Sequence, residues 1–409
     1  MTRAERTYYV VYGLYCSSWS TLTPVYPLFL LSRGLDLFEI NLVFATYLLV
    51  AFFFEVPTGA IADVFGRKTS FLLSCAVRGV AFMMYWYAQG FADCLVAEFA
   101  DGVGTTLASG ALDAWVVDSV RDAGDAAQVG RIFARAGFWA SPMMIVGGLF
   151  GSYVADVDLG MAWPCGAALF LATGVVAFFW MEENRLPATR RESLWRSWLD
   201  TSRAGLVVVR RSPVLRVLCL LTAATSFAVM PAWHYWPARL QQLSGAGVWL
   251  LGWVWALITL ASMAGNVLMP RLVPRFSRQN VLAVAWLWRG AMLAIGALSN
   301  NLSLAVGAVL AMQAVYGLSE PTLQGWMNEH AGSEQRATVL SARSMAFTFG
   351  GGAGLVCLGL LGRAYGITAV WAASAILVIL IAPGFLWLSH KPALAASGQD
   401  RKSALPTVV

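Results

Sequence analysis

The feature that most constrains the fold is a series of apolar segments that recurs along the whole 409-residue chain. Each segment holds roughly 20 apolar residues, enough for an α-helix to cross about 30 Å of hydrocarbon. Only 12% of the residues are charged, whereas soluble domains carry about 25%. We therefore expect an all-α polytopic membrane protein with twelve transmembrane helices near 8–31, 39–62, 69–90, 94–118, 132–155, 160–181, 214–238, 248–270, 280–298, 302–328, 338–361 and 366–389.

The chain also repeats itself at an offset of 211 residues, without a gap. The aligned pairs are Arg67 and Arg278, Arg78 and Arg289, Gly79 and Gly290, Trp115 and Trp326, and Asp118 and Glu329. Such a repeat indicates two structurally equivalent halves. We expect two pseudo-symmetric six-helix bundles at 1–183 and 213–390, a basic cytoplasmic linker at 184–212 and a disordered tail at 391–409.

A short charged loop with a glycine at its start separates the second and third apolar segments. It reads Gly59-Ala-Ile-Ala-Asp63-Val-Phe-Gly66-Arg67-Lys68. This stretch resembles the G-x-x-x-D-x-x-G-R-K loop between helices 2 and 3 of the major facilitator superfamily (MFS) of transporters. The resemblance, to members of the bacterial permease and efflux type, implies transport by alternating access through a cavity lined by helices 1, 4, 7 and 10.

The same loop predicts a gating latch made of Gly59, Asp63, Gly66, Arg67 and Asp118. Gly59 is expected to allow a close helix approach, and Gly66 a tight turn into helix 3. The resemblance implies that Arg67 meets Asp118 at the end of helix 4 and that Asp63 faces the positive amino end of helix 11. The second half keeps only Arg278 of this loop, so we expect the charge latch in the first half alone.

Charged residues inside apolar spans are candidate functional groups, because each is costly in hydrocarbon unless it is paired or faces water. Helix 4 carries Glu98, Asp101 and Asp113, which share one helical face at about 100° per residue. Carboxylates in such a place can bind and release protons. We expect Asp113 to be the coupling residue, since Glu98 and Asp101 should lie nearer to the outer surface and be better hydrated.

Two arginines, Arg78 and Arg289, occupy equivalent depths in the two halves. The expected partners are Asp101 or Asp113 for Arg78, and Glu320 for Arg289. Each pair is either a structural ion pair or part of a proton or anion site. The rest of the predicted cavity is aromatic and polar, with Tyr15, Trp19, His234, Trp236, Gln313 and Gln324.

The distribution of basic residues predicts the orientation. Most of the 28 lysines and arginines fall in loops on the side of the two termini, and the opposite loops hold only Arg33, Arg239 and Arg363. Because cytoplasmic loops carry the positive excess, we expect a multi-pass protein of the bacterial inner membrane with both termini cytoplasmic. This topology accounts for the net charge of +6, and no nucleic-acid partner is expected.

The motifs of enzymes and ATPases are missing from the sequence: it has no phosphate-binding loop, metal-ligand spacing or nucleophile elbow. We therefore expect no cofactor, no metal and no enzymatic activity. The leading interpretation is a monomeric secondary active transporter in the lipid bilayer that exports a small organic solute in exchange for protons. The alternatives are a proton-coupled importer of an organic anion, and a non-transporting receptor or lipid-handling protein on the same fold.

Overall fold

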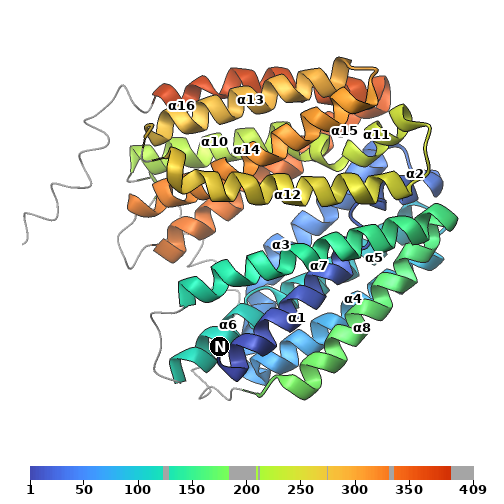
Figure 1. The fold of residues 1–409 in the computed structure, drawn as a ribbon, viewed down its shortest axis with the longest axis vertical. Helices are drawn as coiled ribbons and strands as arrows, with labels where there is room; N and C mark the ends of the chain where they lie inside the picture. Colours follow the sequence, from blue (N-terminus) through green and yellow to red (C-terminus); the bar gives the residue numbers. More distant parts are fainter. Residues whose placement is uncertain (123–128, 184–208, 211, 274, 331–335, 388–409) are drawn as a thin grey trace, which may run out of the picture. The chain divides into compact units, whose positions relative to one another are not determined.

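The computed structural model describes residues 1–122, 129–183, 209–210, 212–273, 275–330 and 336–387 (Figure 1). The predicted tail at 391–409 and nearly all of the predicted linker at 184–212 lie outside these residues. The helices of the first half are α1 (Arg3–Ser20), α2 (Tyr26–Ser32), α3 (Leu37–Phe65), α4 (Arg67–Tyr87), α5 (Phe91–Ala108), α6 (Ala111–Asp122), α7 (Val129–Val157), η2 (Leu159–Met161) and α8 (Ala162–Trp180). Those of the second half are α10 (Pro213–His234), α11 (Trp236–Ser244), α12 (Trp249–Leu272), α13 (Arg278–Leu298), α14 (Leu302–Glu329), α15 (Arg336–Ile381) and α16 (Pro383–Trp387).

The helices match the predicted spans. In the described part of the chain, nine helical segments are long and apolar enough to cross a membrane. The last of them, Thr338–Trp387, contains two predicted spans that Gly366 separates with a φ of 82°. The predicted spans at 8–31 and 94–118 are not among the nine, because their longer helices, α1 and α5, each carry three charged side chains. The all-α polytopic fold class is confirmed.

Two glycines with positive φ separate consecutive helices in the first half of the chain. Gly66 adopts a φ of 102° between α3 and α4, a backbone conformation that residues with a Cβ rarely adopt. Gly110 adopts a φ of 74° between α5 and α6. As a result, the predicted fourth transmembrane helix consists of two helices, and the direction of its second part is not set by the first.

The residues group into two compact units. The first consists of Met1–Arg196, His234–Leu260 and Leu355–Gly366, and the second of Ser197–Trp233, Ala261–Gly354 and Ile367–Val409. Each unit therefore draws on both halves of the sequence. The boundaries expected from the repeat, at 1–183 and 213–390, stay a prediction.

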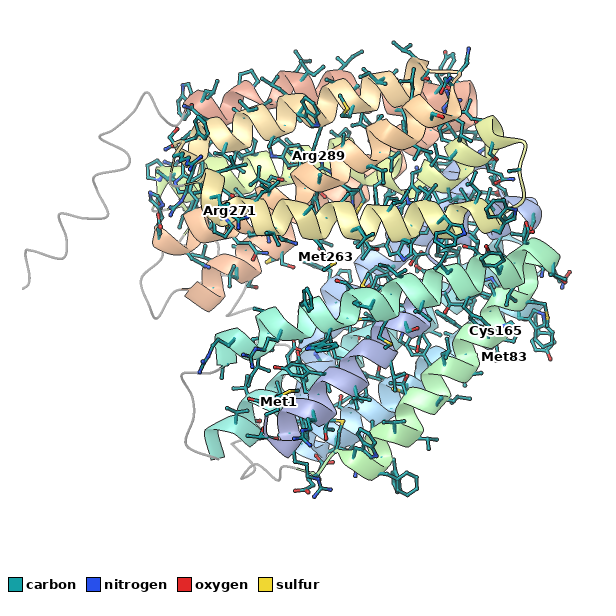
Figure 2. All side chains as sticks on the ribbon, in the orientation of Figure 1. Met1, Met83, Cys165, Met263, Arg271 and Arg289 are labelled. Carbon is teal, nitrogen blue, oxygen red and sulfur yellow. The ribbon has the colours of Figure 1, made fainter. Side chains whose placement is uncertain are left out.

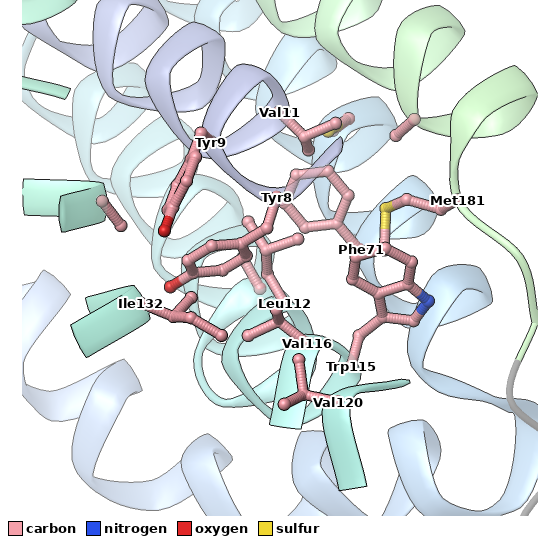
Figure 3. Close-up of a cluster of buried hydrophobic side chains, with 14 residues drawn as sticks. Tyr8, Tyr9, Val11, Phe71, Leu112, Trp115, Val116, Val120, Ile132 and Met181 are labelled. Atoms are coloured by element: carbon pink, nitrogen blue, oxygen red, sulfur yellow. The ribbon is translucent and has the colours of Figure 1, made fainter. Parts of the chain in front are cut away.

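In the first unit, α1 lies beside α7 and α8, and α4 lies beside α5 and α8 (Figure 1). Tyr8, Phe71, Trp115 and Met181 belong to a buried cluster that joins α1, α4 and α6 to the end of α8 (Figure 3). Lipid tails are as apolar as these side chains, so close packing rather than transfer from water holds such helices together. The cluster fixes the helices that carry the charged residues described next.

Small residues let α1 and α7 approach closely. Gly147 lies against the backbone of Ser17, and Gly151 against the backbone of Thr21, so a Cβ at either position would overlap main-chain atoms. The Ser20 hydroxyl donates a hydrogen bond of 2.6 Å to the carbonyl of Met144 across the same interface. These contacts are typical of helix pairs in membranes, where small residues permit backbone approach.

Candidate functional site

A cavity of about 440 Å³ lies inside the first unit. Its wall is formed by α1 to α5 and α8, together with His234 at the end of α10. The charged residues in the wall are Arg78, Glu98 and Asp101. Most of the remaining wall is aromatic, with Tyr15, Trp19, Tyr26, Tyr47, Phe82, Tyr85 and Trp163. This volume and composition are typical of small-molecule sites.

Arg78 on α4 pairs with Asp101 on α5. Its Nε donates to Oδ1 at 2.8 Å and its Nη2 donates to Oδ2 at 3.1 Å, while Nη1 donates to the Tyr15 hydroxyl at 2.9 Å. The guanidinium also lies over the ring of Phe170, 4.4 Å from its centre. Gly104 on α5 makes room for it, because a Cβ there would overlap the Arg78 side chain. Of the two partners expected for Arg78, the structure brings Asp101 to it, in the bidentate geometry that Arg favours.

Glu98 lies one turn before Asp101 on α5 and is 5% exposed. The hydroxyls of Tyr26 and Tyr85 both donate to its Oε2, at 2.8 and 2.6 Å. Trp163 stacks on the Tyr85 ring at 4.0 Å and holds it in place. Among the described residues, no Lys, Arg or His forms an ion pair with Glu98. Within the described part of the chain, the hydrogen bonds to this carboxyl group therefore come from two phenols.

Sequence reasoning gave no role to Tyr85 or Trp163. Tyr85 comes seven residues after Arg78, which places both on the same face of α4. A tyrosine two turns from a charged residue was therefore a usable signal. Trp163 carried no such signal, because it lies on another helix, α8, and reaches Tyr85 only through the packing of the two helices.

The better hydration expected for Glu98 and Asp101 is not seen, and their depth in the membrane relative to Asp113 stays a prediction. Glu98 and Asp101 are buried, at 5% and 7% exposure, whereas Asp113 is exposed. Asp113 accepts a hydrogen bond of 2.6 Å from the Tyr8 hydroxyl instead of joining the Arg78 pair. The reason is the break at Gly110, after which Asp113 lies in the first turn of α6. A single helical repeat cannot be extended across it.

The predicted cavity aromatics divide into two groups. Tyr15, Trp19 and His234 line the cavity, and the His234 ring packs edge-on against Phe44 at 3.9 Å. Trp236 is buried outside it, stacked over Trp255 at 6.5 Å. The Trp255 indole nitrogen donates to the Ser20 hydroxyl at 2.7 Å.

The predicted latch forms in part. Arg67 Nη1 lies 2.9 Å from Asp63 Oδ1, and Arg67 Nε lies 3.7 Å from Asp118 Oδ2. The close approach expected at Gly59 is not seen in the described residues, since a Cβ there would meet no atom within 4 Å. That Asp63 faces the amino end of helix 11 stays a prediction.

Glu183 caps the amino end of α4, a contact that the sequence did not predict. Its carboxylate accepts hydrogen bonds from the Lys68 and Thr69 amides, at 3.1 and 3.0 Å, and from the Thr69 hydroxyl at 2.9 Å. These are free amides of the first turn of α4, where a negative charge is favourable. Glu183 lies shortly after α8, so the contact joins the carboxyl end of α8 to the amino end of α4.

In the second unit, Arg278 forms an ion pair with Glu329. These residues are the repeat equivalents of Arg67 and Asp118. The second half therefore keeps an ion pair that the sequence did not predict, and the expectation that the latch works in the first half alone stays a prediction. The loop motif is lost in the second half, but its ion pair is kept.

Arg289 and Glu320 do not form the expected pair. Glu320 is bonded to Arg343 and accepts a hydrogen bond from Gln324 at 3.2 Å. Arg289, labelled in Figure 2, is 3% exposed and lies over the rings of Trp286 and Tyr316, at 4.6 and 5.1 Å. Gln313 is buried on α14, one turn before Tyr316. The two buried arginines thus have different surroundings.

Comparison with known proteins agrees with this architecture. The family model of the Major Facilitator Superfamily matches residues 8–287 and 240–408. The chain belongs to the major facilitator superfamily, and it is a multi-pass membrane transporter of that family. It is 20% identical over 369 residues to the uncharacterized MFS-type transporter YxaM of Bacillus subtilis (strain 168), covering 88% of this chain and 89% of that protein.

Solved structures show the same fold. The nucleoside transporter NupG matches with a TM-score of 0.77 and 14% identity, over 95% of this chain and 99% of the other. The human organic anion transporter MFSD10 (TETRAN) matches with a TM-score of 0.65 and 17% identity, over 94% and 99%. At these identities the likeness concerns the fold, and the chemistry has to be argued from the residues of this chain.

Proposed function

We propose that this protein is a secondary active transporter that moves a small organic solute by alternating access, coupled to a proton bound at Glu98. The observation that carries the proposal is the burial of Glu98 between two phenols, without an ion pair in the described residues. An ionised carboxylate removed from water needs a cation or a proton close by. Glu98 is therefore suited to bind and release a proton as its access to water alternates.

The neighbours of Glu98 support this role. Arg78 and Asp101 carry opposite charges and neutralise each other in their bidentate pair. The net charge of Arg78, Asp101 and Glu98 taken together is then the charge of Glu98. Tyr26 and Tyr85 can donate to an ionised Glu98, and a phenol oxygen can accept from a protonated one, so both protonation states find hydrogen-bond partners.

Export is the proposed direction. Proton-coupled exporters of the superfamily carry a glycine-rich motif on helix 5, and this chain has a partial match from Gly137 through Pro142 to Gly148. Gly147 and Gly151 on the same helix pack against the backbone of α1. The proposal includes a monomer without enzymatic activity, in a bacterial inner membrane, with both termini in the cytoplasm.

The test is transport by the purified protein in proteoliposomes with an imposed pH gradient. A solute is first identified by a thermal-shift screen of metabolites. Glu98→Gln should lose uphill accumulation, down to the level of protein-free vesicles, while solute counterflow without a gradient persists. Asp113→Asn is the matched control, because that carboxylate is exposed on α6. Uphill transport by Glu98→Gln at the wild-type rate contradicts the proposal, and absence of any flux favours a non-transporting role.

A further inference from the structure

Arg289 is a buried cation that forms no ion pair with any carboxylate among the described residues. It is 3% exposed, and its Nε is buried without a hydrogen-bond partner. In the part of the chain that the structure describes, no carboxylate forms an ion pair with it. Its guanidinium lies over the faces of Trp286 and Tyr316. Ring faces attract a cation weakly compared with a carboxylate, so the charge is not neutralised by them.

The internal repeat shows what is missing. The ion pairs of Arg67 with Asp118 and of Arg278 with Glu329 place α4–α6 and α13–α14 in the same register, 211 residues apart. In that register Arg289 corresponds to Arg78, and the position of Asp101 is occupied by Met312. Met312 is buried on α14, which packs against α13. The second half has kept the arginine and lost its carboxylate.

The carboxylate next along α14 does not replace it. Glu320 is engaged by Arg343 and by Gln324. A buried charge without a partner is strongly unfavourable. An anion that binds from outside the chain would supply the missing counter-charge.

We propose that Arg289 binds the carboxylate of the transported solute, a small planar organic anion. The guanidinium fork matches a carboxylate with two parallel hydrogen bonds. Trp286 and Tyr316 give the site flat walls, and Gln313, which shares the α14 face of Tyr316, supplies a neutral donor. The inference gives the substrate class of the proposed transporter. Its statement about transport rests on the proposed function, but binding of the anion can be measured independently of transport.

The experiment is the thermal stability of the purified full-length protein at neutral pH with benzoate, an aromatic carboxylate. Benzamide, of the same shape without the charge, is the control ligand. Benzoate should raise the melting temperature of the wild type and benzamide should not. In Arg289→Gln the half-saturating benzoate concentration should rise roughly tenfold or more, equivalent to one lost charged hydrogen bond. In Arg271→Gln, which removes an exposed cation at the end of α12, it should stay at the wild-type value.

A second variant keeps the test decisive if Arg289→Gln does not fold. Met312→Asp places a carboxylate at the position equivalent to Asp101, where it should pair with Arg289 and exclude benzoate. Met312→Asn should bind benzoate like the wild type. Equal stabilisation by benzoate and benzamide, or unchanged benzoate binding in Met312→Asp, overturns the assignment. Benzoate binding without any flux in proteoliposomes would leave the site intact and contradict the proposed transport function instead.

Discussion

At the scale of single residues, the two buried arginines show how an environment decides the role of a side chain. Arg78 and Arg289 occupy equivalent positions and both lie against aromatic rings. Arg78 has a bidentate carboxylate partner, and Arg289 has none in the described residues. Removal of each arginine should therefore have a different effect on stability.

Arg78→Met should lower stability by about 3–5 kcal/mol, because it leaves Asp101 buried without its counter-charge. The measurement is the melting temperature of the purified protein. Asp101→Asn added to Arg78→Met should restore part of the loss, since it removes the orphaned charge. A double variant no more stable than Arg78→Met would mean that the ion pair is not the origin of the loss.

Arg289→Met should cost much less than Arg78→Met, and can even raise the melting temperature, because no carboxylate is left unpaired when it is removed. Replacement of buried charges by apolar side chains of similar volume is often neutral or stabilising. The comparison is made on the two single variants under identical conditions. Equal losses for both would show that Arg289 has an internal partner.

At the scale of helices, the turn between α3 and α4 combines a strained backbone position with a distant cap. Gly66 has a φ of 102°, and a Cβ there would collide with the Glu183 carboxylate. That carboxylate holds the first amides of α4. The backbone conformation of Gly66 and the cap formed by Glu183 therefore both contribute to the stability of this turn, and substitutions can distinguish the two contributions.

Gly66→Ala should destabilise the protein by about 1–3 kcal/mol, because a residue with a Cβ rarely adopts this backbone conformation. Glu183→Ala should cost about 1 kcal/mol through the lost cap. In the double variant the collision with Glu183 is removed but the backbone strain remains, so the double variant should stay less stable than Glu183→Ala. The readout is again the melting temperature. A double variant as stable as Glu183→Ala would assign the whole effect to the collision.

At the scale of the whole molecule, alternating access requires contacts that open and close at the ends of the helices. The first unit holds Arg67 with Asp63 and Asp118, and the second holds Arg278 with Glu329. Asp63 is 56% exposed, so its pair contributes little to folding. A change at Asp63 should therefore alter the balance of states more than stability.

Asp63→Asn should leave the free energy of unfolding within about 1 kcal/mol of the wild type and shift the protein toward cytoplasm-open states. The measurement is the labelling rate of single cysteines placed on the two sides of the membrane. Labelling should rise on the cytoplasmic side and fall on the outer side. Unchanged labelling together with unchanged transport would remove Asp63 from the latch.

The sequence by itself determined the membrane class, the position of the helices, the repeat and the superfamily. Those properties are local or additive: the length of an apolar segment, a residue offset and a ten-residue loop. The pairing of Arg78 with Asp101 was one of two possibilities read from helical depth. The resemblance of the loop to the superfamily also implied that Arg67 and Asp118 are partners.

Only the tertiary structure decided which charged groups are isolated. The break at Gly110 separates Asp113 from the face of Glu98 and Asp101, because a helical repeat ends where the backbone leaves the helix. The phenols on Glu98 come from α2 and α4, and the partner of Glu320 comes from α15. Such contacts depend on the rotation and approach of whole helices, which packing sets and which no single segment encodes.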